Sequence, residues 1–165
     1  MEPIIDLHSD RHFMGEALRQ AHRALQSEEV PVGAVVVRGG VIIARSHNQV
    51  ETLKDATAHA EMLALTQAAS VVGDWRLSDC EVFVTKEPCP MCAGAMIHGR
   101  VKRVVFGCPS TKDGAAGGLM NLLQHPKLNH QCEITSGVRH DECAQMLQAF
   151  FRERRLQRPA VPSTG

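Results

Sequence analysis

The chain has 165 residues, 44% of them hydrophobic, and its 18 lysines and arginines balance its 18 aspartates and glutamates. This composition excludes a largely disordered chain and favours one domain with a core of its own. With no net charge, 4% aromatic residues and no tyrosine, the chain is not a general electrostatic or stacking binder of nucleic acid. Any RNA contact must therefore be local.

The sequence shows neither a secretory signal nor an apolar run of about 20 residues, so we expect no membrane segment. Six cysteines without an export signal indicate reduced thiols and a cytoplasmic protein. Four of them are scattered singly, and we expect most of these to serve as small buried residues: Cys80, Cys108, Cys132 and Cys143.

The spacing of apolar residues and the turn residues between them predict alternating helices and strands. We expect a single domain over residues 1–165, with flexible tails at 1–8 and 158–165. In chain order the predicted elements are a helix capped by Ser9 and ending near 27–29, strands at 34–38 and 41–46, a polar loop at 47–57, a helix at 58–69, a strand at 81–85, a helix at 91–98, a strand at 102–107, a glycine-rich loop at 108–118, a short helical turn at 119–124, a strand at 132–135 and a helix at 140–157.

This order of elements also predicts the fold class. A run of strand, helix, strand, helix and strand implies parallel neighbours joined by crossover helices. The Gly39-Gly40 pair between the first two strands predicts an antiparallel hairpin. We therefore expect an α/β fold with three layers, α-β-α, around a mixed central sheet of about five strands.

Two short motifs carry side chains that bind metals. The letters HAE stand at 59–61 at the start of one predicted helix, and PCPMC at 88–92 leads into the first turn of another. His59, Cys89 and Cys92 supply three donors, the number that a catalytic zinc takes from protein while one position stays open for water. Both cysteines would lie at a helix N-terminus, where the helix dipole favours the thiolate. Glu61 would act as a base on the water, because a fourth protein ligand would close the site.

Each of these features has a simpler interpretation. A C-x-x-C pair alone could be a redox pair or half of a structural zinc site, but no thioredoxin-like strand precedes it and no second pair exists. Asn48 at the end of a strand is more often a turn residue. The basic run at 150–158, with two phenylalanines, is on physical grounds alone a solvated helix face, and its functional alternative is a local RNA surface.

The H-x-E and P-C-x-x-C pairing is the signature of zinc nucleobase deaminases. From residue 13 to 155 the chain resembles the cytidine deaminase superfamily, and within it the tRNA-specific adenosine deaminases. The resemblance depends on EVPVGAV at 29–35, TAHAE at 57–61, EPCPMCAGAMIH at 87–98, RVVFG at 103–107, GAAGGLM at 114–120, NH at 129–130 and FFR at 150–152.

The resemblance implies a cytidine deaminase-like fold, one Zn²⁺ per subunit on His59, Cys89 and Cys92, and Glu61 as proton shuttle. It implies hydrolytic deamination of adenosine to inosine at the wobble position of a tRNA anticodon loop, by a homodimer whose RNA surface is drawn from both subunits. In this interpretation Asn48 binds the target base, Asn129 contacts the anticodon loop, and Phe151 and Arg155 hold it. The full set of implied substrate-binding residues is Asn48, Ala60, Ser110, Asn129, Phe151 and Arg155.

The sequence departs from the family pattern at three positions. Ser110 stands where an aspartate is usual in the loop that contacts RNA, Lys86 replaces an apolar residue, and Ala56 replaces a common proline. Two alternative functions remain open at this point. One is a deaminase of a free nucleobase or nucleoside of the guanine or cytidine type, and the other is a zinc-stabilised RNA-binding protein without turnover.

Overall fold

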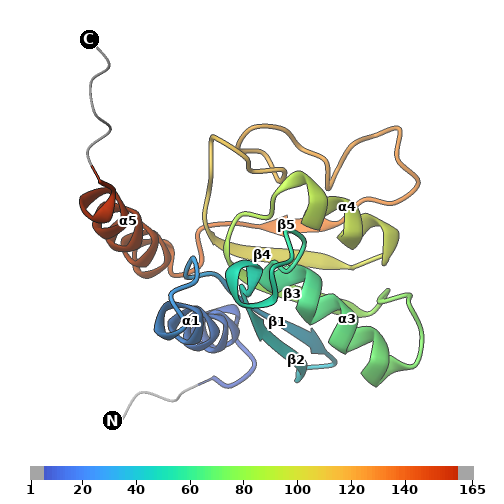
Figure 1. Cartoon of the computed structure of the whole chain (residues 1–165). Coiled ribbons are helices and arrows are strands. Elements are labelled where there is room, and N and C mark those ends of the chain that lie inside the picture. Colours follow the sequence, from blue (N-terminus) through green and yellow to red (C-terminus); the bar gives the residue numbers. More distant parts are fainter. Residues whose placement is uncertain (1–5, 160–165) are drawn as a thin grey trace.

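The computed structural model describes residues 6–159, and the structural statements below refer to these residues. Five strands form one sheet in the order β2-β1-β3-β4-β5 (Figure 1). Strand β1 (Gly33–Arg38) pairs antiparallel with β2 (Val41–His47) and with β3 (Cys80–Lys86). Strand β4 (Arg103–Cys108) runs parallel to β3, and β5 (Glu133–Thr135) runs parallel to β4. The predicted mixed sheet is thus confirmed.

Helices cover both faces of this sheet, which confirms the three predicted layers. Helices α1 (Asp10–Gln26) and α5 (His140–Gln157) cover one face, and α3 (Ala60–Val72) and α4 (Pro90–His98) cover the other (Figure 1). A short helix, α2 (Val50–Leu53), precedes α3. Side chains alternate across each strand, so that Val82 and Val84 join the core under α3 and α4, whereas Phe83 joins the core under α1 and α5.

The helix ends follow local chemistry, and two of them locate the metal motifs. Ser9 caps α1, because its hydroxyl accepts a hydrogen bond from the His12 amide at 3.1 Å. His59 is the N-cap residue of α3 and Cys89 that of α4, where Pro90 takes the first helical position. Both motifs therefore lie at helix N-termini on the same side of the sheet.

Two predictions about the loops are wrong. The predicted polar loop at 47–57 contains α2, because the Glu29 carboxylate accepts hydrogen bonds from the amides of Glu51 and Thr52 and stabilises a helical turn there. The predicted helical turn at 119–124 is not helical. Instead the amides of Leu122 and Leu123 donate back to Ala115, and the apolar side chains close a compact loop.

The sequence also predicts flexible tails at both ends of the chain and buried single cysteines. Residues 6–8 of the expected N-terminal tail form a turn that the Ser9 amide closes onto the Asp6 carbonyl, whereas residues 1–5 and 160–165 of the expected tails lie outside the described residues. In the described part of the chain, no helix combines the length and the apolar character that crossing a membrane requires. All six cysteines are free thiols, and the four scattered ones are buried as predicted: Cys80, Cys108, Cys132 and Cys143.

Candidate active site

The two metal motifs meet between the N-termini of α3 and α4. The Nδ1 atom of His59 lies 3.5 Å from the sulfur of Cys89 and 3.5 Å from the sulfur of Cys92. All three donor atoms lie within 4.8 Å of one another, and this is the one group of its kind found among residues 6–159. The structure therefore brings together the three residues that the spacing of the motifs selected as metal ligands.

The separation of the donor atoms fits zinc. Zn–S bonds of about 2.3 Å and Zn–N bonds of about 2.0–2.1 Å at a tetrahedral centre place nitrogen and sulfur about 3.6 Å apart. The observed distances from His59 to the two sulfurs are 3.5 Å. Three protein donors of the nitrogen and thiolate type leave the fourth tetrahedral position open, which is the donor set of a catalytic zinc rather than a structural one.

The two thiols are electrostatically unequal. Hydrogen bonds from Cys92 and from His59 lower the pKa of Cys89 to about 4, against the opposing effect of burial. The neighbouring Cys89 thiolate and burial raise the pKa of Cys92. Cys89 is thus the more easily deprotonated of the two thiols. A divalent cation at this point would favour the thiolate form of both, since metals bind thiolates.

Glu61 lies in the first turn of α3, two residues after the predicted ligand His59. Its side chain is 4% exposed and lines the same pocket as His59 and Cys89. Burial raises the pKa of the Glu61 carboxyl above its ordinary value, which favours its protonated form. A carboxyl group of this kind can take a proton and give it back, as a general base and acid must.

These residues line a pocket of about 260 Å³. Asn48, which directly follows β2, is 7% exposed and lines this pocket. Phe151 reaches the same pocket from α5, although α5 packs on the opposite face of the sheet. The remaining lining residues are Glu29, Val30, Val32, Val50, Glu51, Lys86, Glu87 and Asp113.

The other predicted substrate-binding residues are not among those that line the pocket. Ala60 is buried directly after His59. Ser110 contacts the pocket through Asp113, to which its hydroxyl donates a hydrogen bond at 2.6 Å. Arg155 is exposed on α5, one turn beyond Phe151, and Asn129 is exposed in the loop before β5.

Sequence reasoning missed the residue that shapes the loop beside the pocket. The buried Glu87 carboxylate accepts hydrogen bonds from the amides of Ser110 at 3.0 Å, Ala116 at 2.9 Å and Gly118 at 2.9 Å. A Cβ atom at Gly118 would collide with this carboxylate and with the Ser110 carbonyl, which explains the glycine. The EPC triplet at 87–89 was visible in the sequence, but its partners stand more than twenty residues later.

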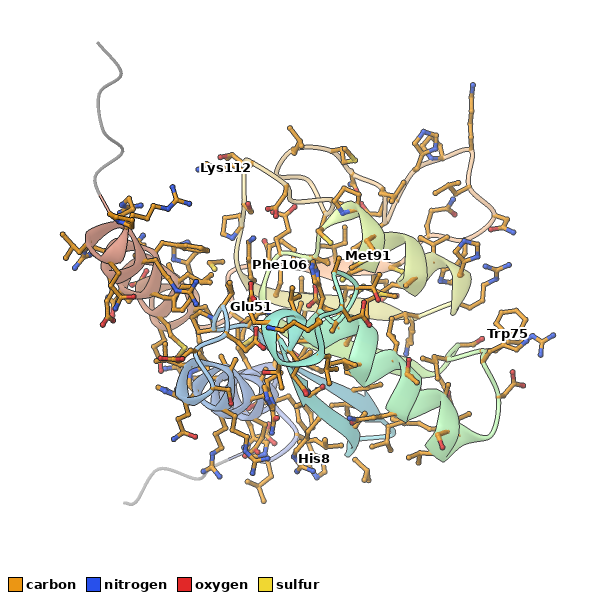
Figure 2. All side chains as sticks on the ribbon, viewed as in Figure 1. His8, Glu51, Trp75, Met91, Phe106 and Lys112 are labelled. Carbon is orange, nitrogen blue, oxygen red and sulfur yellow. The ribbon has the colours of Figure 1, made fainter. Side chains whose placement is uncertain are left out.

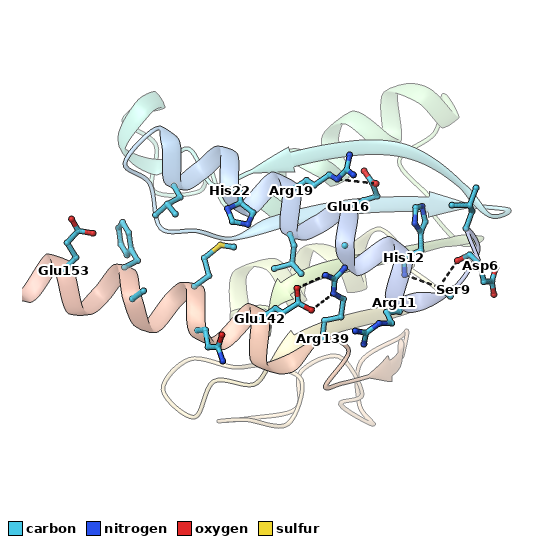
Figure 3. A pocket seen from close by; sticks show the side chains of 18 residues that line it. Asp6, Ser9, Arg11, His12, Glu16, Arg19, His22, Arg139, Glu142 and Glu153 are labelled. Carbon is cyan, nitrogen blue, oxygen red and sulfur yellow. Dashed lines mark hydrogen bonds and ion pairs between the residues drawn. The ribbon is translucent and has the colours of Figure 1, made fainter. Parts of the chain in front are cut away.

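A larger groove of about 1370 Å³ lies between α1 and α5, on the other face of the sheet (Figure 3). Its charged side chains pair mainly with each other, as Arg139 does with Glu142 at 2.6 Å and Arg19 with Glu16 at 3.8 Å. It includes none of the predicted metal ligands and not Glu61. The chemistry therefore belongs to the smaller pocket.

Comparisons with known proteins agree with this geometry. Residues 8–155 match the model of the MafB19-like deaminase family. The tRNA-specific adenosine deaminase of Bacillus subtilis is 51% identical, over 92% of this chain and 94% of that protein. A solved structure from a study of A-to-I editing by tRNA:A34 deaminases is 39% identical and has a TM-score of 0.80, over 82% of this chain and 99% of that one. The guanine deaminase of Nitrosomonas europaea is 25% identical, with a TM-score of 0.76, over 90% of this chain and 87% of that one.

Proposed function

Because the chain belongs to the family of tRNA-specific adenosine deaminases, we propose that it converts adenosine to inosine at the wobble position of a tRNA anticodon loop. The observation that carries this proposal is a group of three metal donors beside a pocket that two of them, His59 and Cys89, line together with the buried carboxyl of Glu61. The deaminase domain extends over the whole chain in this proposal, in keeping with the family match over residues 8–155.

Zinc held by His59, Cys89 and Cys92 would supply the Lewis acidity that lets water attack at neutral pH. Glu61 takes one proton from the attacking water and delivers it to N1 of adenine, while the water oxygen bonds to C6. Glu61 then moves the second proton to the amino group, and ammonia leaves. Adenosine and water thus become inosine and ammonia. The raised pKa of the Glu61 carboxyl lets it hold a proton between the two transfers.

Residues in and near the pocket can receive an unstacked base and its neighbours. A base in a single-stranded loop is unstacked at low cost and can enter a narrow site. Asn48 lines the pocket and has the amide donors and acceptor that a purine edge requires. Phe151 is 43% exposed at the same pocket, where an aromatic ring can stack on a neighbouring base. The arginines that follow on α5, including Arg155, supply local positive charge on a neutral protein.

Incubation with an anticodon stem-loop RNA that carries adenosine at the wobble position tests the function. We expect one inosine and one ammonia per RNA, with inosine read as guanosine on sequencing. Free adenosine, cytidine and guanine serve as parallel substrates, since the guanine deaminase has a similar fold. Faster release of ammonia from guanine or from a free nucleoside than from the RNA would overturn the tRNA assignment. Bound zinc without ammonia from any substrate would indicate a non-catalytic protein.

We further propose that the enzyme is a homodimer that binds tRNA with both subunits. Asn129 is exposed and does not line the pocket of its own subunit, so a second subunit would let it act on the same RNA. Leu119 and Met120 are 56% and 44% exposed in the neighbouring loop, where they give an interface an apolar centre. Sedimentation equilibrium should give twice the 18.0 kDa mass of the chain, and a monomer that retains full activity would contradict the proposal.

We also propose that the enzyme acts in the cytoplasm. Its six cysteines are free, and two of them must stay reduced to bind zinc. A reducing compartment keeps thiols in this state. Fractionation of cells that express the protein, followed by detection with an antibody, checks this location.

A further inference from the structure

One charged side chain at the metal pocket has no role in the proposed chemistry. Lys86 is the last residue of β3, and its side chain lines the pocket. Val84 and Val82, two and four residues earlier, pack in the core under α3 and α4. Since side chains two apart in a strand share a face, Lys86 leaves the sheet on the side of the metal site.

A second residue holds this lysine in place. The Nζ atom of Lys86 lies 3.2 Å from Oδ2 of Asp113, and the hydroxyl of Ser110 donates to Oδ1 of the same carboxylate at 2.6 Å. An ammonium group has three donors, so that Asp113 leaves two of them free. The Lys86 side chain is 27% exposed, which is enough for a ligand to reach it.

Lys86 differs in charge from the other ionisable residues that line the pocket. Of the described residues that line the pocket, Lys86 is the only lysine or arginine. Five carboxyl groups line the same space, namely those of Glu29, Glu51, Glu61, Glu87 and Asp113. Backbone amides bind the carboxylates of Glu29 and Glu87, and the proposed zinc lies beside Glu61. A phosphate that stays outside the metal site therefore has few positive side chains near it. Among the described lining residues, Lys86 is the one whose side chain offers an ammonium or guanidinium group to such a phosphate.

We propose that Lys86 binds a backbone phosphate directly next to the target adenosine, and that Asp113 and Ser110 position the ammonium group for it. A lysine ammonium suits a phosphate as a compact point charge. This inference rests on the proposed function, because it requires a polynucleotide substrate. Lys86 then contributes to holding the RNA backbone, and the transfer of protons by Glu61 is independent of it.

The first test measures RNA binding by the zinc-loaded enzyme. The Lys86→Met variant should bind the stem-loop RNA about tenfold more weakly, and the slope of log Kd against log salt should fall by about one. Lys86→Arg should retain most of the affinity, because it keeps the charge. Lys102→Met, at an exposed lysine before β4 that does not line the pocket, should change Kd less than twofold. Lys112 is less suitable as a control, since it is exposed in the same loop as Asp113 (Figure 2).

The second test locates the phosphate. Stem-loop RNAs with an uncharged methylphosphonate at either phosphate flanking the wobble adenosine remove one charge at a time. One of them should weaken binding to the wild type about tenfold and leave binding to Lys86→Met unchanged. If each methylphosphonate weakens binding to Lys86→Met by the same factor as binding to the wild type, Lys86 contacts neither phosphate. That result would overturn the inference.

The third test separates a lost contact from new repulsion. Removal of Lys86 leaves the Asp113 carboxylate, 47% exposed, without its cation, and this charge alone could repel RNA. The double variant Lys86→Met with Asp113→Asn should remain about tenfold weaker than the wild type. Recovery to wild-type affinity would overturn the phosphate contact. An absence of inosine in the wild type would instead refute the proposed function. The two failures can be told apart, because the binding experiments measure Kd and do not require turnover.

Discussion

Replacement of Glu61 by alanine should lower the rate of inosine formation by about a thousandfold or more while zinc and RNA stay bound. General acid and base catalysis by one positioned group contributes about 10² to 10⁴, and Glu61 is proposed to serve in both proton transfers. It is the one carboxylate inside either metal motif, and it is buried beside His59. Single-turnover assays on the stem-loop RNA measure the chemical step directly.

Two measurements separate this loss from a damaged fold. Zinc content by atomic spectroscopy and the Kd for the stem-loop RNA should both remain within about twofold of the wild type. Glu61→Gln, which keeps the volume of the side chain, should be equally inactive. Glu133→Ala removes an exposed carboxylate on β5 and should leave the rate unchanged. Near-normal inosine formation by either Glu61 variant would refute its role as proton shuttle.

Replacement of Glu87 by glutamine should lower the free energy of unfolding by about 3 kcal/mol. One carboxylate oxygen accepts from Ala116 and Gly118, and the other accepts from Ser110. An amide would direct its NH₂ group at one of these donors, lose charge-assisted hydrogen bonds and leave a half-buried N–H without a partner. Urea unfolding followed by circular dichroism measures the change, with Glu133→Gln as the exposed control.

The Glu87 variant should also lose RNA affinity. Its three partners fix the loop that carries Ser110 and Asp113, and Asp113 in turn holds Lys86 at the pocket. We expect KM for the stem-loop RNA to rise more than kcat falls, since the metal ligands belong to other segments. Unchanged stability together with unchanged KM would show that the loop holds its shape without the carboxylate.

The sequence predicted the strands, the long helices and the metal site because these depend on local patterns. Alternation placed Val82 and Val84 on one face of β3, and motif spacing placed His59 and Cys89 at helix starts. The missed features depend on contacts between distant residues. Glu29 stabilises α2 across more than twenty residues, and Lys86 pairs with Asp113 across a similar separation.

The failed prediction at 119–124 has a similar physical cause. The apolar residues in this stretch have helical spacing, but the glycines before it let the chain fold back sharply. The Gly118 amide donates to the Glu87 carboxylate and the Gly114 amide donates to the Ser110 carbonyl, so neither continues a helix. Leu123 is fully buried because the loop closes over the core, and not because a helix presents it. A tertiary hydrogen-bond acceptor thus overrode a weak local preference.

Phe151 enters the pocket from α5, whereas all three predicted metal ligands come from the opposite layer of the sheet. Beyond Phe151, the side chains of α5 are exposed up to the end of the helix. Mutation of this last stretch therefore costs little folding energy. Under the proposed function, the RNA contacts made by α5 can therefore be varied separately from the residues that carry the deamination chemistry.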